Sequence, residues 1–167
     1  MHSITEFLAW LQASPLAVFI HKKAWAFTTI EVIHVCAVSL VLGTIAIVDL
    51  RLLGFASTQR PFAELSRKVL PFTWAAFVLA VIAGSLLFIS RATEYFVNTV
   101  FWVKMSLIAL AGINMMIFEF ITARGVQGWN LNPRPPAPAR LAGGLSITFW
   151  VLVVVCGRLI GFTLPIE

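Results

Sequence analysis

The chain has 167 residues, of which 60% are hydrophobic and only 11% are charged. A typical soluble domain has about 25% charged residues and under half apolar ones, so this composition predicts an integral membrane protein. A chain of this length has no room for a large soluble domain, which excludes most enzyme architectures. Most of the basic residues lie in short connections between apolar runs, where they set membrane orientation, so we expect no nucleic-acid partner.

The first segment, SITEFLAWLQAS, predicts a short helix lying on the membrane surface. Ser3 and Glu6 have the spacing of a helix capping box at its start. Its apolar residues fall on one helical face, namely Ile4, Phe7, Leu8 and Leu11. An amphipathic helix of this kind lies at the interface between lipid and water.

Four later runs approach or exceed the roughly 20 apolar residues that cross a bilayer. They cover about residues 24–50, 69–90, 100–122 and 145–164. Pro71 is expected in the first turn of the second run, and the proline-rich segment 132–140 is expected to be a connector. The prediction is an all-α, integral membrane four-helix bundle with an N-terminal interfacial helix, forming one transmembrane domain over residues 1–167.

The distribution of basic residues predicts the orientation of this bundle. The two long connections carry Arg51, Arg60, Arg67, Lys68, Arg124, Arg134 and Arg140. Only Lys22, Lys23 and Arg91 belong to the other side. The positive-inside rule places both connections in the cytoplasm and both termini outside the bacterial inner membrane. Four tryptophans are expected near span ends as interfacial anchors: Trp25, Trp74, Trp102 and Trp150.

Lines of small residues indicate where helices approach closely. The second run has Ala76, Ala80 and Gly84 at four-residue spacing, and the segment GRLIG has Gly157 and Gly161. Such lines let backbones pack together in lipid, either within one bundle or between subunits. We expect a compact bundle and a homo-oligomer.

The segment IEVIHVCAVSLVLGTIAIVDLRLLG, residues 30–54, carries Glu31 and His34 on one helical face. Counted from the span centres, Glu31, His34, Lys104 and Arg158 all lie in the outer half of the membrane. A charged group at a span centre costs roughly 2.5–3.5 kcal/mol, so an unpaired one is not expected to face lipid. These four residues are therefore the candidate site.

Two explanations of this candidate site remain open. In one, Glu31 pairs with Arg158, neutral His34 forms a hydrogen bond, and Lys104 extends toward the membrane surface. In the other, the bundle binds haem b with His34 as axial ligand and the two basic side chains on the propionates, while Glu31 tunes or orients the site.

The second axial ligand of such a haem is not determined by the sequence. The other histidines are His2 and His21, and His21 is roughly 20 Å from His34 along a continuous helix. The iron would be five-coordinate, use Met105 or another methionine, or take a ligand from a neighbouring subunit. A copper site is a further alternative, with Glu31 and His34 at metal-ligand spacing and Cys156 at a similar depth.

The polar residues deeper in the membrane have simpler interpretations. Asn114 is expected to form an interhelical hydrogen bond. Asp49, Arg51 and Glu119 are expected toward the cytoplasmic side, where pairing or extension to the surface explains them, although Glu119 could end a proton path.

Four segments carry a resemblance to a known family: SPLAVFIHKKAWAFTTIEVIHVCAVSLVLGTIAIVDLRLLG, LPFTWAAFVLAVIAGSLLF, FWVKMSLIALAGINMMIFE and GRLIG. They resemble a family of small, uncharacterised bacterial four-span membrane proteins, and more distantly b-type membrane cytochromes and copper-resistance membrane proteins. The resemblance implies the four-span fold and is compatible with both cofactors. The family pattern has a histidine at the end of the third segment where this sequence has Glu119, so the resemblance implies no two-histidine site.

We therefore expect a haem b protein that transfers electrons at the outer side of the bacterial inner membrane. Its partner would be quinol, a periplasmic donor or a partner subunit. The alternatives are a cofactor-free, homo-oligomeric scaffold or channel, and a copper-handling membrane protein. No independent catalytic activity is expected, because the sequence has no catalytic Ser/His/Asp order and no phosphate-binding glycine loop.

Overall fold

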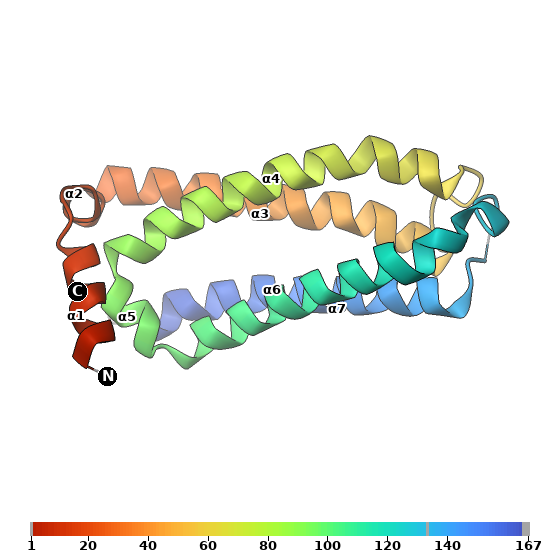
Figure 1. Ribbon diagram of the computed structural model, residues 1–167. Coiled ribbons are helices and arrows are strands. Elements are labelled where there is room, and N and C mark those ends of the chain that lie inside the picture. The colour runs from red at the N-terminus through yellow and green to blue at the C-terminus, as the bar shows by residue number, and fades with distance from the viewer. Residues whose placement is uncertain (1, 133, 165–167) are drawn as a thin grey trace.

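The computed structural model describes residues 2–132 and 134–164 and is built from helices (Figure 1). The long helices are α3 (Ala24–Leu53), α4 (Phe62–Ser90), α6 (Thr99–Ile117) and α7 (Ala137–Thr163). A π-helical turn, Phe118–Thr122, and a 3-10 helix, Ala123–Gly128, extend α6. All four spans are long and apolar enough to cross a membrane. The predicted all-α membrane bundle is confirmed.

Three short helices and both chain ends lie at one end of the bundle, which we call the terminal end (Figure 1). These helices are α1 (His2–Gln12), α2 (Pro15–Lys22) and α5 (Ala92–Val97). The predicted N-terminal helix is therefore present, but a bend of 63° separates α1 from α2. Ser14 caps α2 by accepting a hydrogen bond from the Ala17 N–H, with Pro15 in the first turn. Because α1 begins at His2, Ser3 is inside the helix and not its cap.

The helices extend further than the apolar runs, especially at the opposite end, which we call the loop end. Helix α4 begins at Phe62 and α7 at Ala137, where residues 69 and 145 were predicted. Pro71 therefore lies inside α4, and Pro138 is in the first turn of α7. The length of an apolar run predicts the part of a helix that crosses the lipid. The helix itself can continue into the polar layer as long as its backbone hydrogen bonds are formed.

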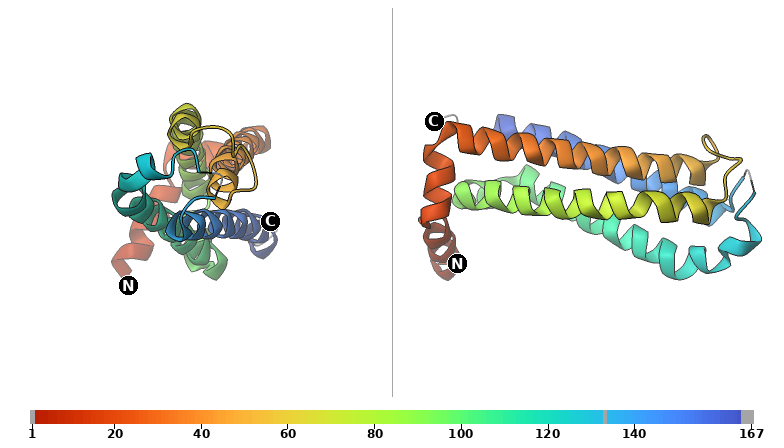
Figure 2. Two further views of the ribbon diagram at one scale, coloured as in Figure 1. Left: turned by 90° about the vertical axis from the view of Figure 1, so that its right-hand side faces the viewer. Right: turned by 90° about the horizontal axis from the view of Figure 1, so that it is seen from above.

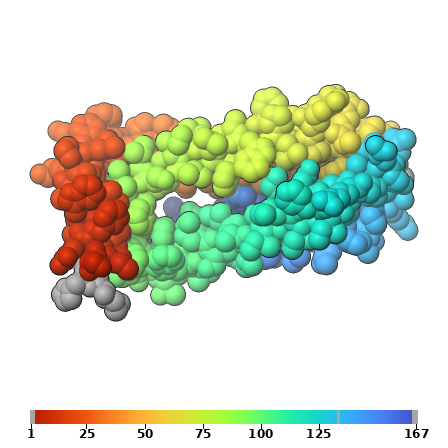
Figure 3. Space-filling model, in the orientation of Figure 1, coloured from red at the N-terminus to blue at the C-terminus, as the bar shows by residue number. Residues whose placement is uncertain are grey.

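Pairwise packing leaves one side of the bundle open. Helix α3 packs against both α4 and α7, and α6 packs against α7, whereas α4 and α6 share few contacts in the described chain. Figure 2 shows the four helices end-on, and Figure 3 shows a hollow between α4 and α6 in the half toward the terminal end. Helices α3 and α7 approach closely at Gly143, where an added Cβ would lie 3.0 Å from Leu52 Cβ. The tight packing therefore surrounds α3.

A buried arginine joins the two connections at the loop end. Arg51 is 0% exposed. Its guanidinium donates to the carbonyl oxygens of Arg60, Asn132 and Asn130 at 3.2, 3.3 and 3.2 Å. Asn130 in turn accepts from the N–H groups of Phe62 and Ala63, the first residues of α4, at 3.0 and 2.9 Å. Among the described residues, Arg51 thus neither pairs with an acid nor extends to the surface, contrary to the expectation from sequence.

An apolar cluster lies beside this arginine and completes the loop end. Its buried members come from α3, α4, the α6–α7 connection and α7: Leu52, Phe62, Trp129 and Ala139. The Phe62 and Trp129 rings are 5.3 Å apart. The Arg51 hydrogen bonds and this cluster together fix how the four helices meet.

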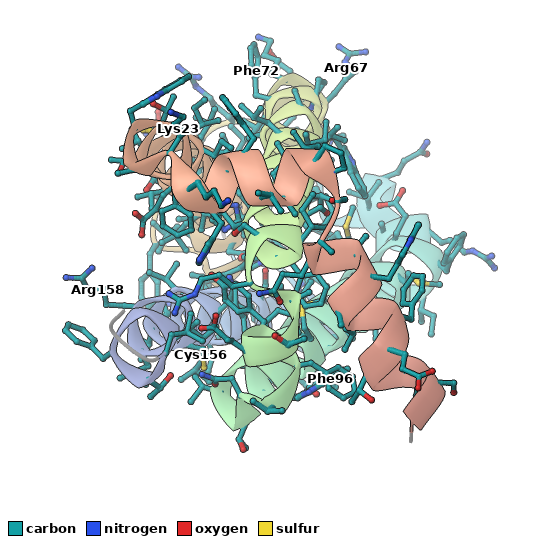
Figure 4. All side chains as sticks on the ribbon, turned by 90° about the vertical axis from the view of Figure 1, so that its left-hand side faces the viewer. Lys23, Arg67, Phe72, Phe96, Cys156 and Arg158 are labelled. Carbon is teal, nitrogen blue, oxygen red and sulfur yellow. The ribbon has the colours of Figure 1, made fainter. Side chains whose placement is uncertain are left out.

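The substitution Arg51→Leu is expected to lower the free energy of unfolding by about 3 kcal/mol, because three backbone carbonyls lose a charged donor. Arg51→Lys should also destabilise the protein, since an ammonium group lacks the planar fork that reaches three acceptors. Thermal unfolding in detergent, followed by size-exclusion chromatography, measures both effects. The control is Arg67→Leu, at an exposed arginine that points away from the bundle in Figure 4. Equal melting of the Arg51 and Arg67 variants would contradict the role of Arg51.

Candidate functional site

His34 is fixed between α3 and α4 by a hydrogen bond to the backbone. Its Nδ1 lies 2.9 Å from the carbonyl oxygen of Ala80. A carbonyl can only accept, so Nδ1 carries the proton and donates, and Nε2 of the neutral ring keeps a free lone pair. Within the described residues, Nε2 makes no hydrogen bond. Metal-ligating histidines use this arrangement, in which a backbone acceptor sets the tautomer and ring orientation.

The imidazole reaches Ala80 because Gly84 leaves space for it. A Cβ added at Gly84 would lie 2.9 Å from His34 Cε1 and 3.3 Å from Nδ1. Any side chain at this position would therefore displace the ring. The small-residue line of α4 serves a contact within the chain, with Ala76 and Ala80 buried and Gly84 against the histidine.

Lys104 of α6 also lies inside the bundle, on the side of α7. A Cβ added at Gly157 would be 3.6 Å from its Nζ. Lys104 is close enough for its charge to act on His34, and Cys156 is its ionisable neighbour on α7. The structure therefore brings His34 and Lys104 into one region, in the same half of the bundle as the hollow of Figure 3.

The other predicted site residues lie apart from this pair. Arg158 is exposed and stacks on Phe162, with its guanidinium carbon 5.0 Å from the ring centroid. Figure 4 shows Arg158 pointing away from the helices. Met105 is 43% exposed on the outer surface of α6. Glu31 is exposed and forms no ion pair with Arg158 in the described structure.

Glu31 instead lies near the short helix α5 at the terminal end of the bundle. Burial raises the pKa of Tyr95 in α5, and the negative charge of Glu31 adds to that rise. His21, at the end of α2, is exposed. The side chain of His2 lies outside the described residues. Among the described side chains, no three His, Cys, Asp or Glu residues come close enough to hold a metal ion, so Glu31, His34 and Cys156 do not assemble a copper site.

A second group of polar residues lies toward the loop end, away from His34. The Asn114 side chain of α6 donates to the carbonyl oxygen of Ala142 in α7 at 2.9 Å, which confirms the predicted interhelical hydrogen bond. Asp49, Asn114 and Glu119 all line one partly open cavity. Trp74 and Trp150, which were predicted as interfacial anchors, line it too.

Several functional features could not be assigned from sequence. The spacing of small residues predicted that Gly84 allows close packing. It did not predict that the packed group is the His34 imidazole. The hydrogen bond from His34 to Ala80 depends on the rotation of α3 against α4, which residue types do not specify. The Phe77 ring contacts Trp74 within α4 at 6.0 Å between centroids, and it contacts Trp150 of α7 at 6.3 Å. The second contact joins two helices that are far apart in sequence.

Comparison with known proteins places the chain in a family. No curated protein and no solved structure matches it. The comparisons show no similarity to b-type membrane cytochromes or to copper-resistance membrane proteins. Residues 7–163 match one family along nearly the whole chain, so the protein belongs to DUF6644, a family of unknown function.

Proposed function

We propose that this protein binds haem b between its helices, with His34 as the axial ligand, and acts in electron transfer. The observation that supports this is the His34 ring itself. Its Nδ1 is held by the Ala80 carbonyl, which leaves Nε2 as an unprotonated nitrogen able to bind iron. The hollow between α4 and α6 in Figure 3 gives a flat macrocycle a way in from the open side of the bundle.

Lys104 is the cation that this proposal assigns to a haem propionate. It lies within the bundle beside Gly157, and its charge acts on His34. A lysine can serve as a point charge for a carboxylate in a partly dry site. Arg158 and Met105 have no part in the proposal, because both side chains face outward. Glu31 is likewise exposed and is not assigned a role.

The iron would have one ligand from this chain. A bound haem would supply one-electron redox chemistry, and the protein would supply its binding, orientation and surrounding charge. The exposed basic residues at the loop end support a cytoplasmic loop end and extracytoplasmic termini in a bacterial inner membrane. Electrons would pass to or from quinol, a periplasmic donor or a partner subunit, and the outward face of α6 suits a homo-oligomer.

The visible absorption spectrum tests haem binding directly. Protein purified in mild detergent and supplied with haemin should show a Soret band that shifts on reduction. His34→Ala should abolish or shift this band because the axial nitrogen is lost, whereas His21→Ala, at an exposed histidine outside the bundle interior, should leave it unchanged. A Soret band that is the same in the wild type and His34→Ala would reject the assignment.

A wild-type protein with no Soret band after haemin loading would also reject the proposal. The ionisable side chains between the helices would then belong to a cofactor-free scaffold or channel. In that case ion flux into liposomes, measured with Glu31→Gln and Glu119→Gln, would separate a channel from a scaffold.

A methyl group at Gly84 should disturb the haem site without removing the ligand. In Gly84→Ala the new Cβ would lie 2.9 Å from His34 Cε1, so the ring must shift from its position beside the Ala80 carbonyl. We expect at least a fewfold lower haem occupancy or a displaced Soret maximum. The matched control is Gly161→Ala, where an added Cβ meets no atom within 4 Å. Identical spectra for the two variants would show that His34 orientation does not matter for the bound group.

A further inference from the structure

The half of the bundle toward the loop end contains a partly open cavity of about 170 Å³. All four long helices contribute to its walls, which are mainly apolar and aromatic. The aromatic residues in the wall are Phe62, Trp74, Phe77, Phe118 and Trp150. For comparison, an engineered protein cavity of about 150 Å³ binds benzene. This cavity can therefore hold a molecule about the size of one aromatic ring.

Asp49 of α3 lines this cavity and has an unsatisfied oxygen. The residue is 5% exposed, and its Oδ2 is buried with no hydrogen-bond partner. Ser146 of α7 is its side-chain hydrogen-bonding neighbour. Arg51, two residues away, directs its guanidinium to backbone carbonyls instead. A buried carboxylate oxygen without a donor is costly, so a native structure retains one only for a reason.

The charge of the wall indicates what would satisfy this oxygen. Asp49 and Glu119 are the acidic residues of the wall, and no basic side chain belongs to it in the described structure. An anionic ligand would be repelled, whereas a cationic one would gain an ion pair with Asp49. The aromatic rings add a second attraction, because a cation is stabilised over the face of Trp or Phe.

We propose that this cavity binds a small organic cation, an ammonium group on an apolar body about the size of a single ring, with Asp49 as its counter-ion. The aromatic wall would contact both the ammonium group and the apolar body. The ammonium would take the place of the missing partner of Asp49 Oδ2.

An inorganic cation fits the cavity less well. Hard metal ions need about six oxygen ligands. Within the described residues, no group of three His, Cys, Asp or Glu side chains could hold such an ion. The wall is dominated by carbon, which suits an organic body and leaves a bare ion without ligands. The site is also distinct from His34, so the inference does not depend on haem binding.

The test uses benzylammonium, whose N–H groups can donate to Asp49 Oδ2, and its neutral carbon isostere, ethylbenzene, on the full-length protein in detergent. Calorimetry measures binding, and fluorescence reports on Trp74 and Trp150 in the wall. We expect the wild type to bind the cation, and Asp49→Asn to bind it about tenfold or more weakly, which corresponds to the loss of one ion pair. Binding of the neutral isostere should change less than threefold. Glu64→Gln, at an exposed glutamate paired with Lys68, is the matched control and should bind like the wild type.

A second variant keeps the proposal testable if Asp49→Asn does not fold. Gly112 of α6 belongs to the wall, and a Cβ added there meets no atom within 4 Å. Gly112→Leu therefore has room for its Cβ, and its side chain should occupy part of the cavity and abolish binding of both compounds. The proposal is overturned if the wild type does not bind the cation at millimolar concentration, or if either variant binds it as tightly as the wild type. A Soret band unaffected by Asp49→Asn would separate this result from the haem proposal.

Discussion

The guanidinium of Arg51 is the constraint on which the rest of the structure depends. Its three hydrogen bonds join the end of α3 to both long connections, and Asn130 passes the restraint on to the first turn of α4. Apolar burial between helices supplies little net drive in lipid, so directed polar contacts and close packing must set the arrangement. A fully buried arginine is tolerated here because its donors meet carbonyl oxygens.

This constraint also determines which residues of α3 point toward α4 nearer the terminal end. With the loop ends fixed, the rotation of α3 against α4 directs His34 at the position where α4 has Gly84. The imidazole then reaches the Ala80 carbonyl, and its second nitrogen is left available. The geometry of the candidate haem ligand thus follows from helix packing and from one missing side chain. It does not require a local motif beyond the histidine itself.

The sequence predicted the parts of this structure that depend on composition and periodicity. Four apolar runs were enough to predict four spans, and a conspicuous Asn114 was enough to predict an interhelical hydrogen bond. Depth along a helix also predicted that His34 and Lys104 lie in one half of the bundle. Depth along a helix does not specify the direction in which a side chain points, however. The prediction therefore grouped Arg158 and Glu31 with them, although both are exposed. Depth likewise did not predict that Arg51 would donate to three backbone carbonyls of the connections.

Inward-facing polar residues come from several helices, since α6 contributes Lys104 and Asn114 although it packs mainly on α7. Helix α3 packs on two helices, and it contributes both His34 and Asp49, which lie about four turns apart. Helix α6 packs mainly on α7, so much of its surface, including Met105, faces outward. A single well-packed helix therefore supplies the central group of each proposed site, one at each end of the bundle. The two sites share a scaffold but no side chain, so a substitution in one can be measured against the other as an internal reference.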